Sequence, residues 1–525
     1  MNSNCFSRNN FIALKFSSLM FNKRLRILNL NNKRTSKSSA DDRYIRGYNE
    51  IPGPKALPLI GNSWRFLPVI GQHRIEKIDV MSKQLREQYG DIVKVDKILS
   101  RPDMVLLFDA EQIEKVFRNE DTLPFRPSMS SLNYYKHVLR KDFFGDEGGV
   151  IAVHGENWLK FRTKVQQPIL QPQIAKLYIN VIEETAELFV SRIRKIRRKN
   201  NEVGENFLND IHLWSLESIA QIALDIKLGC LDDAVRKDTE ILIAAIHTFF
   251  ANVAILEFKV PFWKIFNTRT WKKCITALDT MRNVTMKYIT QALEKKLIQT
   301  NNSSNENASL LQRILELDPK NPKLATILAL DMFLVGIDTT SAAVASILYQ
   351  LSQHQDKQHI LFNEICSILP NRNDKLTTKE LQRLIYLKAF IKETFRMYPV
   401  VLGNGRCLTK EMEICGYQVP KGVHVIFQHY VISNSEHYFK NANKFEPERW
   451  LKHNKEQTHA FASLPFGFGK RMCLGRRFAE LEIQILIAKL VQNFHIEYTR
   501  QPLEYEVQPL YLPKGPLSFT FSDRT

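Results

Sequence analysis

Cys473 is the residue whose surroundings most clearly indicate chemistry. It lies in a glycine-rich segment, residues 465–475, that leads directly into a helical pattern. Such a loop lets backbone N–H groups reach the sulfur, and the positive end of the following helix favours negative charge there. A lone cysteine is more often a small core residue. In this setting we instead expect an anionic sulfur that takes part in chemistry.

A second polar feature, Asp338 followed by Thr339, interrupts a long apolar stretch between Thr326 and Leu351. An aspartate in the middle of such a stretch argues against a membrane span and favours a buried helix that carries function. The alternative for the threonine is a hydrogen bond to its own helix carbonyl, but this would not explain the neighbouring aspartate.

The elements that must position these residues are mostly helices. Helical patterns cover residues 174–298 and 324–397, while residues 91–96 and 104–108 alternate as short strands do. The polar segment 299–308 is typical of a surface loop. The sequence therefore predicts a mainly α fold with a minor β-sheet region.

The charge of the chain is concentrated partly at its N-terminus. Residues 1–40 contain eight basic residues and no acidic one, and without them the net charge of +19 falls to +11. A basic, serine-containing and potentially amphipathic segment is typical of a mitochondrial transit peptide, and its apolar runs are broken at Lys15 and Lys23. The alternative is a disordered basic tail. We expect a transit peptide at 1–40 and a folded domain from 41 to 525, with a stiff, proline-rich stretch at 51–61.

The seven cysteines are scattered, and none belongs to a CxxC pair. The pattern predicts neither a disulfide framework nor a cysteine-based zinc site, and it agrees with a reducing compartment.

The cysteine loop resembles the haem-binding loop of the cytochromes P450. Five residues spread over ten positions carry the likeness, namely Phe466, Gly469, Arg471, Cys473 and Gly475. Three further segments follow the order and spacing of that family, so the resemblance extends from about Ile51 to the C-terminus. It implies the cytochrome P450 fold, and haem b (heme b) whose iron takes the Cys473 thiolate as axial ligand. Phe466 would line the cofactor.

The resemblance also implies a structural network behind the cysteine loop. Glu393 and Arg396 lie three residues apart on one helical face. Arg449, in the segment 445–450, is similar to the arginine that completes a Glu-Arg-Arg network in this family. Its implied role is to lock the cysteine loop, without a part in catalysis.

Trp158 and Arg162, four residues apart, would point an indole N–H and a guanidinium in the same direction. By resemblance these two donors bind a haem propionate, and Arg471 and Arg406 are further propionate candidates. The alternative interpretation places Trp158 in the core and Arg162 in solvent.

The segment Val335 to Thr340 resembles the acid–alcohol pair with which P450 monooxygenases deliver protons during dioxygen activation, with Asp338 and Thr339 as the pair. Gly336 would leave room for dioxygen. Val335 departs from the small residue found in many relatives. The implied reaction inserts one oxygen atom from O2 into a small hydrophobic substrate.

Four cations are placed around the cysteine side of the expected haem: Lys388, Lys392, Arg476 and Arg477. They resemble positions with which mitochondrial P450s bind a small acidic [2Fe–2S] ferredoxin, which a ferredoxin reductase supplies with electrons. The alternative is an ordinary solvated face. No nucleic-acid partner is expected. The resemblance implies a location on the matrix side of the mitochondrial inner membrane, with peripheral membrane contact.

Residues 134–144 and 154–158 look particularly like insect mitochondrial P450s, which oxidise either xenobiotics or ecdysteroid-like sterols. Substrate contacts would come from three segments, 125–135, 400–402 and 511–514. An aromatic run between Phe249 and Phe266 would line an entrance, meet the membrane or belong to the core.

Two rival functions are a haem-thiolate isomerase and a non-catalytic haem carrier or sensor. Neither needs Asp338 and Thr339, so their presence favours a monooxygenase.

Overall fold

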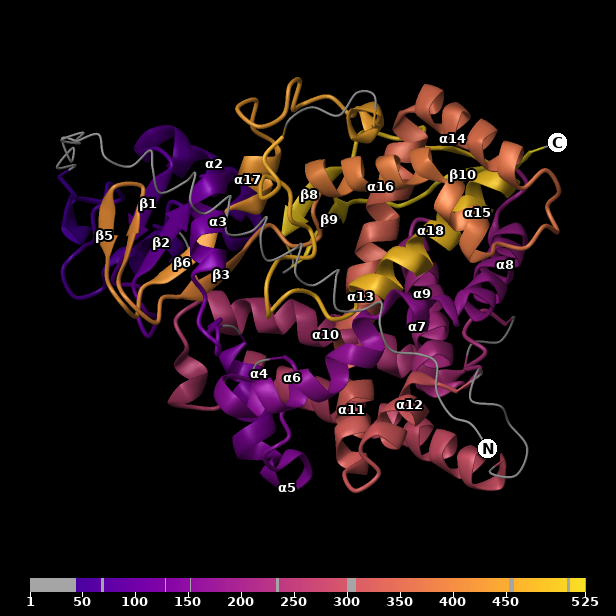
Figure 1. Cartoon of the computed structure of the whole chain (residues 1–525), viewed down its shortest axis with the longest axis horizontal. Coiled ribbons are helices and arrows are strands. Elements are labelled where there is room, and N and C mark those ends of the chain that lie inside the picture. Colours follow the sequence, from indigo (N-terminus) through magenta and orange to yellow (C-terminus); the bar gives the residue numbers. More distant parts are fainter. Residues whose placement is uncertain are drawn as a thin grey trace, which may run out of the picture. The chain divides into compact units, whose positions relative to one another are not determined.

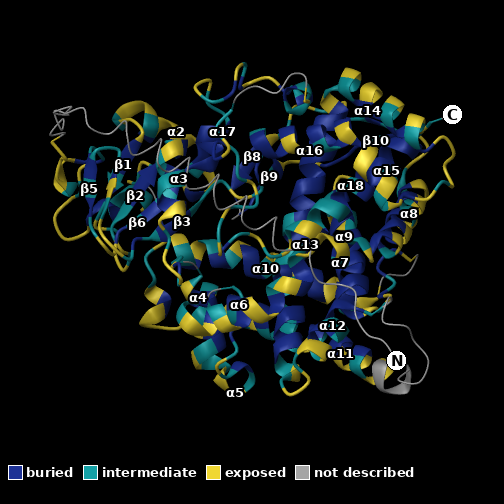
Figure 2. Ribbon diagram, in the orientation of Figure 1, coloured by how far each residue is buried: buried dark blue, intermediate teal, exposed yellow. Residues whose placement is uncertain are grey.

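The apolar stretch around Asp338 forms the middle of α13 (Pro322–Gln353), a helix of 32 residues. Pro322 stands in its first turn, where the N–H group that proline lacks would have no helical partner. Helices α9 (Phe207–Leu224), α11 (Arg269–Gln299) and α18 (Arg476–Asn493) pack against it. Figure 2 shows buried residues concentrated along α9, α13 and α18.

This computed structural model describes residues 44–67, 70–127, 129–151, 153–232, 236–299, 308–452, 458–507 and 510–524. The expected transit peptide and nearly all of the polar loop 299–308 lie outside the described residues. The residues from Arg46 onward form one compact unit.

Two helices, α13 and α10 (Lys237–Phe258), are long and apolar enough to cross a membrane by length and composition. In α13, 72% of the apolar window is buried inside the protein. The interpretation of residues 326–351 as a core helix is therefore confirmed.

The remaining α-helices follow the order of the chain. They are α2 (Ile78–Tyr89), α3 (Ala110–Arg118), α4 (Ser130–Tyr134), α5 (Lys141–Phe144), α6 (Gly155–Leu170), α7 (Pro172–Lys176), α8 (Ile179–Ile196), α12 (Leu310–Leu317), α14 (Gln355–Ile368), α15 (Thr378–Arg383), α16 (Ile385–Met397) and α17 (His429–Ser433).

The main sheet has four strands in the order β1-β2-β6-β3. They are β1 (Ile92–Val95), β2 (Met104–Leu107), β6 (His424–Phe427) and β3 (Asn404–Cys407). β2 and β6 run parallel, and the two outer pairs run antiparallel. The strands predicted at 91–96 and 104–108 coincide with β1 and β2. Figure 1 shows this sheet on one side of the unit, with most helices on the other.

Three further strand pairs complete the β structure. They are β4 (Met412–Ile414) with β5 (Tyr417–Val419), β7 (Phe494–Glu497) with β10 (Thr520–Asp523), and β8 (Glu504–Val507) with β9 (Tyr511–Lys514). The predicted class, mainly α with a minor β-sheet region, is confirmed.

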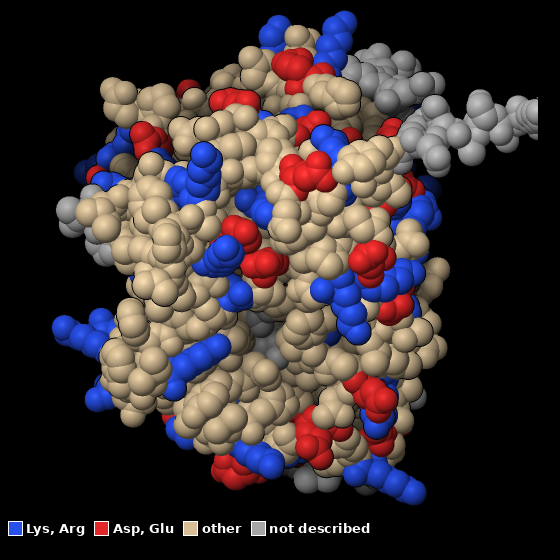
Figure 3. All heavy atoms as spheres, turned by 90° about the vertical axis from the view of Figure 1, so that its left-hand side faces the viewer, with Lys and Arg blue, Asp and Glu red and all other residues tan. Residues whose placement is uncertain are grey.

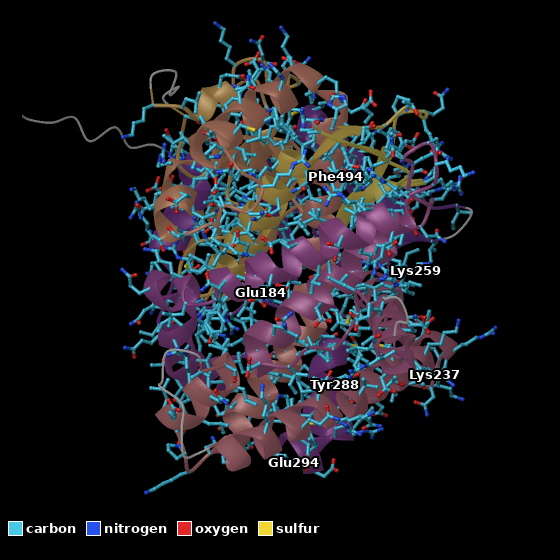
Figure 4. The ribbon with its side chains drawn as sticks, turned by 90° about the vertical axis from the view of Figure 1, so that its right-hand side faces the viewer. Glu184, Lys237, Lys259, Tyr288, Glu294 and Phe494 are labelled. Carbon is cyan, nitrogen blue, oxygen red and sulfur yellow. The ribbon has the colours of Figure 1, made fainter. Side chains whose placement is uncertain are left out.

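Helices α10 and α11 pack along each other and are joined by the 3-10 helix η5 (Phe262–Lys264). Figure 4 labels Lys237 and Tyr288, where the first turn of α10 lies beside α11. Lys287 binds the carboxylate of Asp238 there at 2.5 Å. α10 is thereby held over α9 and α13, which it also contacts.

Candidate active site

The loop before α18 places Cys473 three residues ahead of the first helical residue. Its N–H donates to the carbonyl of Phe466 (2.9 Å), which closes the loop on itself. Gly467 and Gly469 adopt φ angles of 68° and 76°, a region that favours glycine. The backbone N–H groups of Gly475 and Arg476 act to lower the pKa of the Cys473 thiol. The loop therefore aims backbone donors at the sulfur, as its glycines and the following helix predict.

Several effects act on the pKa of the Cys473 thiol in opposite directions. Burial raises the pKa of its thiol, while the Gly475 N–H group and the guanidinium groups of Arg162 and Arg126 lower it, with burial the largest cause. The backbone groups of the loop thus favour the anion, as expected, while burial opposes them. Cys473 is deeply surrounded by protein but accessible, as a sulfur that binds a ligand must be.

Four arginines gather near this sulfur: Arg126, Arg162, Arg406 and Arg471. Among the residues that the structure describes, a single carboxylate, that of Glu120, pairs with one of them, at 2.6 Å from Nε of Arg406. Burial, followed by repulsion from the other three arginines, lowers the pKa of Arg471 to about 9. Burial and repulsion from Arg406 lower the pKa of Arg126 to about 10. We call these four residues the arginine cluster.

Three nitrogens of the arginine cluster are buried and lack a hydrogen-bond partner among the described residues. They are Nε of Arg126, Nε of Arg162 and Nη2 of Arg471. Buried donors normally have partners, so this set is short of acceptors. Two carboxylates supplied by a ligand would satisfy both the charges and the donors.

Trp158 and Arg162 both lie on α6 and are both buried, so the interpretation that left Arg162 in solvent is wrong. Arg162 donates to the carbonyl of Met472 (3.0 Å), beside the cysteine. The guanidinium of Arg471 lies 3.6 Å from the centre of the Trp158 ring and donates to the carbonyl of Val153 (2.9 Å). The four predicted propionate ligands thus lie around one centre.

The sequence prediction did not include Arg126. It lies within the predicted substrate segment 125–135 and stands between Phe125 and Pro127, without a helical spacing that would have revealed its role. The main sheet brings it to the site, because Phe125 accepts a hydrogen bond from the N–H of Cys407 on β3 (2.9 Å). Arg406 lies on that same strand.

These residues fit haem b. Cys473 would hold the iron, and the arginine cluster and Trp158 would hold the propionates. Phe466, near the start of the same loop, has its ring 5.8 Å from that of Phe395.

Glu393 lies at the centre of a second buried group of charges. Arg396 donates to both of its carboxylate oxygens (2.9 Å each), and Arg449 donates to one of them (3.1 Å). The indole N–H of Trp450 and the backbone N–H of Glu446 complete the set (2.9 and 3.0 Å). We call Glu393, Arg396 and Arg449 the glutamate network.

Thr339 and Asp338 lie on different faces of α13. Met332, Val335, Gly336 and Thr339 form its partly accessible stripe, whereas Asp338 is buried. The hydroxyl of Thr339 donates to the Val335 carbonyl (2.7 Å). A Cβ at Gly336 would lie 2.7 Å from Cδ1 of Ile219 on α9. Packing against α9 therefore requires glycine at this position. The expectation that Gly336 leaves room for dioxygen did not include this packing role.

The four predicted partner-binding cations have different surroundings. Lys392 is exposed, 5.8 Å from the Trp450 ring. Arg476 and Arg477 are about two-fifths exposed and share the carboxylate of Glu480 (2.9 and 3.8 Å). Lys388 is half-buried and donates to the carbonyls of Leu381 and Gln382 at the end of α15.

Two of the three predicted substrate segments meet directly. The N–H of Tyr511, on β9, donates to the carbonyl of Val400 (2.9 Å), and β9 contacts α13.

The aromatic run between Phe249 and Phe266 divides into buried and exposed side chains. Phe249, Phe250 and Trp263 are buried, whereas Phe258, Phe262 and Phe266 are 43–57% exposed.

The fold and this donor set define a haem-thiolate enzyme. The family model for Cytochrome P450 matches residues 51–521. The chain therefore belongs to the cytochrome P450 family and is a haem-thiolate monooxygenase.

Three relatives from Drosophila melanogaster illustrate the likeness. "Probable cytochrome P450 301a1, mitochondrial" is 47% identical over 90% of this chain and 86% of its own length. "Probable cytochrome P450 49a1" is 43% identical over 91% and 83%. "Probable cytochrome P450 12a5, mitochondrial" is 35% identical over 91% of each.

Proposed function

We propose that this P450 is a mitochondrial enzyme that receives electrons from an acidic [2Fe–2S] ferredoxin, itself reduced by a ferredoxin reductase. It would insert one oxygen atom from O2 into a hydrophobic substrate, either a xenobiotic or an ecdysteroid-like sterol. The observation that carries this proposal is the group of exposed cations that flanks the cysteine loop.

These cations lie near Cys473, the expected iron ligand, either in the sequence or on a neighbouring helix. Arg476 and Arg477 follow Cys473 by three and four residues, and Arg476 lies 5.6 Å from the ring of Phe466. Lys392 lies on α16, which contacts α18. A positive surface at the thiolate side speeds and orients the approach of an acidic protein. Two relatives are named mitochondrial, which supports this electron source.

Lys388 has a different role in this proposal. Because its ammonium group binds carbonyls at the end of α15, it serves mainly to join α15 to α16, and less to meet the partner. The ferredoxin surface is therefore Lys392, Arg476 and Arg477, with Lys388 behind it.

Asp338 and Thr339 are proposed to supply protons. The haem, when bound, provides the dioxygen chemistry, and its thiolate favours O–O cleavage. The Thr339 hydroxyl, on the accessible stripe of α13, donates to Val335, so its oxygen can still accept a hydrogen bond from water. Asp338, the preceding residue of the helix, would restore the proton.

A test of this role is Thr339→Ala, which removes the hydroxyl but keeps the helix. We expect haem binding to persist while electrons are diverted to peroxide. The quantity to measure is product formed per electron consumed. An unchanged ratio would exclude proton delivery by Thr339.

Localisation to the matrix side of the inner membrane is also part of the proposal. Residues 1–40 would direct import, after which exposed apolar side chains would touch the membrane. Leu59, Ile70, Phe262, Ile265 and Phe266 are among them, each more than half exposed. Figure 3 views the side of β1, β2 and β5, where uncharged surface covers broad areas between separate lysines and arginines.

The decisive experiment compares electron donors. Purified protein should turn over with a [2Fe–2S] ferredoxin and its reductase, and poorly with a flavin reductase. Lys392→Glu should raise the ferredoxin concentration needed for half-maximal turnover, without changing the carbon-monoxide spectrum.

The matched control is Lys199→Glu, the same charge reversal at an exposed lysine after α8. It should leave the ferredoxin requirement unchanged. Rising salt should weaken the wild-type interaction, because the Debye length falls to about 8 Å at physiological ionic strength. Equal ferredoxin requirements for Lys392→Glu and wild type would refute the proposed surface.

A further inference from the structure

Three side chains from three different helices converge on the buried face of α13. They are His212 on α9, His247 on α10 and Asp338 on α13. Nε2 of His212 lies 3.2 Å from Oδ1 of Asp338 and 3.4 Å from Nε2 of His247. The remaining pair, Nε2 of His247 and Oδ1 of Asp338, is 3.8 Å apart.

The triangle formed by these atoms has the size of a metal-binding face. Zinc binds imidazole nitrogen and carboxylate oxygen at about 2.0–2.2 Å in tetrahedral geometry, which separates neighbouring ligand atoms by about 3.3–3.6 Å. The observed edges of 3.2, 3.4 and 3.8 Å bracket that range. Small side-chain adjustments would suffice to bring all three atoms to one ion.

The three side chains also do not satisfy one another's hydrogen-bonding groups. Oδ1 of Asp338 is buried and accepts no hydrogen bond from the described residues. The two imidazole nitrogens face each other, and at most one of them can donate to the other. Burial and the neighbouring His212 lower the pKa of His247, which favours the neutral imidazole that metals bind.

We propose that His212, His247 and Asp338 form a binding site for a divalent zinc ion, with water as the fourth ligand. Two imidazoles and one carboxylate suit zinc better than calcium or magnesium, which prefer oxygen ligands. The ion can enter from the surface, because the side chain of His247 is 44% exposed while His212 and Asp338 are buried.

The site is suited to reversible binding. Metal-binding histidines usually donate their second ring nitrogen to an acceptor, which raises affinity by about 10–100-fold. Nδ1 of His212 is buried and has no such partner among the described residues. Zinc is therefore expected to bind and dissociate reversibly and not to serve as a permanent structural ion.

Zinc at this site would regulate oxidation, and this step rests on the proposed role of Asp338 in proton supply. A carboxylate that binds a metal is a poor proton carrier. Zinc should therefore lower turnover, while leaving haem and substrate binding unchanged.

The test is equilibrium dialysis of the haem-loaded full chain against zinc, with the bound metal measured by mass spectrometry. His247→Asn should remove one equivalent of bound zinc, or weaken its affinity at least about tenfold. Because His247 is half-exposed, this variant should fold, which the carbon-monoxide spectrum checks. The matched control is His359→Asn, an exposed histidine on α14, which should bind as much zinc as wild type.

Equal zinc binding by wild type and His247→Asn would overturn the site and leave a cluster of polar side chains without a metal. The functional step is separable. If His247→Asn loses the bound zinc but zinc does not slow wild-type turnover, the site stands and the role of Asp338 in proton supply falls. If zinc slows wild type and not His247→Asn, both stand.

Discussion

Two buried groups of arginines contribute to the cysteine loop, and they differ in charge balance. In the glutamate network, Glu393 accepts five hydrogen bonds and lies between Arg396 and Arg449. In the arginine cluster, four guanidinium groups repel one another, and the one carboxylate paired with them, that of Glu120, binds Arg406. The first group has its charges balanced. The second needs anions that the described residues do not provide.

The difference teaches how the two groups serve the site. A balanced network stabilises the apoprotein and gives the loop its shape before any ligand arrives. An unbalanced cluster costs the apoprotein stability, and that cost is recovered when a dianionic ligand binds. Haem binding therefore depends on neutralising the charge of the arginine cluster. The shape of the cysteine loop does not depend on it.

The largest expected effect is spectroscopic and separates the iron ligand from both arginine groups. Cys473→Ser removes the thiolate that shifts the carbon-monoxide band to about 450 nm. We expect complete loss of that band, with the arginine cluster intact. A retained band in the reduced, carbon-monoxide-bound variant would mean that another residue binds the iron.

Breaking the glutamate network should cost the most stability. Glu393→Gln leaves two buried guanidinium groups without their shared carboxylate, and we expect a loss of about 3–5 kcal/mol in the free energy of unfolding. Urea unfolding followed by circular dichroism measures this. The control, Glu446→Gln, removes a partly exposed partner of Arg449 and should cost about 1 kcal/mol or less. Similar losses in both variants would contradict a central role for Glu393.

Glu482 on α18 offers a third case, a buried carboxyl that pairs with no cation among the described residues. Burial raises its pKa from 4.5 to about 7, although the Ser218 hydroxyl donates to it. The folded state holds this proton between pH 4.5 and 7 while the unfolded state has released it, so stability falls as pH rises through that window.

Glu482→Gln removes this penalty. Above pH 7 we expect the variant to be more stable than wild type by about 3 kcal/mol, and near pH 4.5 we expect the difference to vanish. Urea midpoints at the two pH values provide the measurement. A difference that does not change with pH would show that Glu482 does not titrate in this range.

The smallest expected effect sharpens the comparison most. Arg162→Met removes one cation from the arginine cluster and its hydrogen bond to the Met472 carbonyl. Repulsion and an unmet donor disappear with it, which offsets that loss, so the apoprotein should lose little stability. Haem should then transfer to an acceptor at least about tenfold faster, because a charge-assisted hydrogen bond is worth about 1.5–3 kcal/mol.

The matching change in the balanced network is Arg396→Met, which should destabilise the apoprotein. If Arg162→Met destabilises the apoprotein equally, the two groups are alike and the distinction between them is wrong.

Local patterns carried the main features of the site. Spacing alone indicated that Glu393 and Arg396 share a face and that Trp158 and Arg162 lie on one helix, because side chains three or four residues apart meet within a helix. The glycines around Cys473 likewise indicated a loop that turns N–H groups toward the sulfur. Alternation indicated the strands β1 and β2.

What tertiary structure decided is which distant side chains share an environment. The pairing of Phe125 with β3 brings Arg126 to the arginine cluster, and no local spacing reveals such a contact. The packing of α9 and α10 against α13 brings His212 and His247 to Asp338. The aromatic run shows that spacing alone does not predict burial either. Trp263 is buried and Phe266 is exposed, although they are only three residues apart. Desolvation of Cys473 also depends on the whole fold. Periodicity reports a residue's face within its own element, whereas charge balance and burial depend on what the other elements bring to that face.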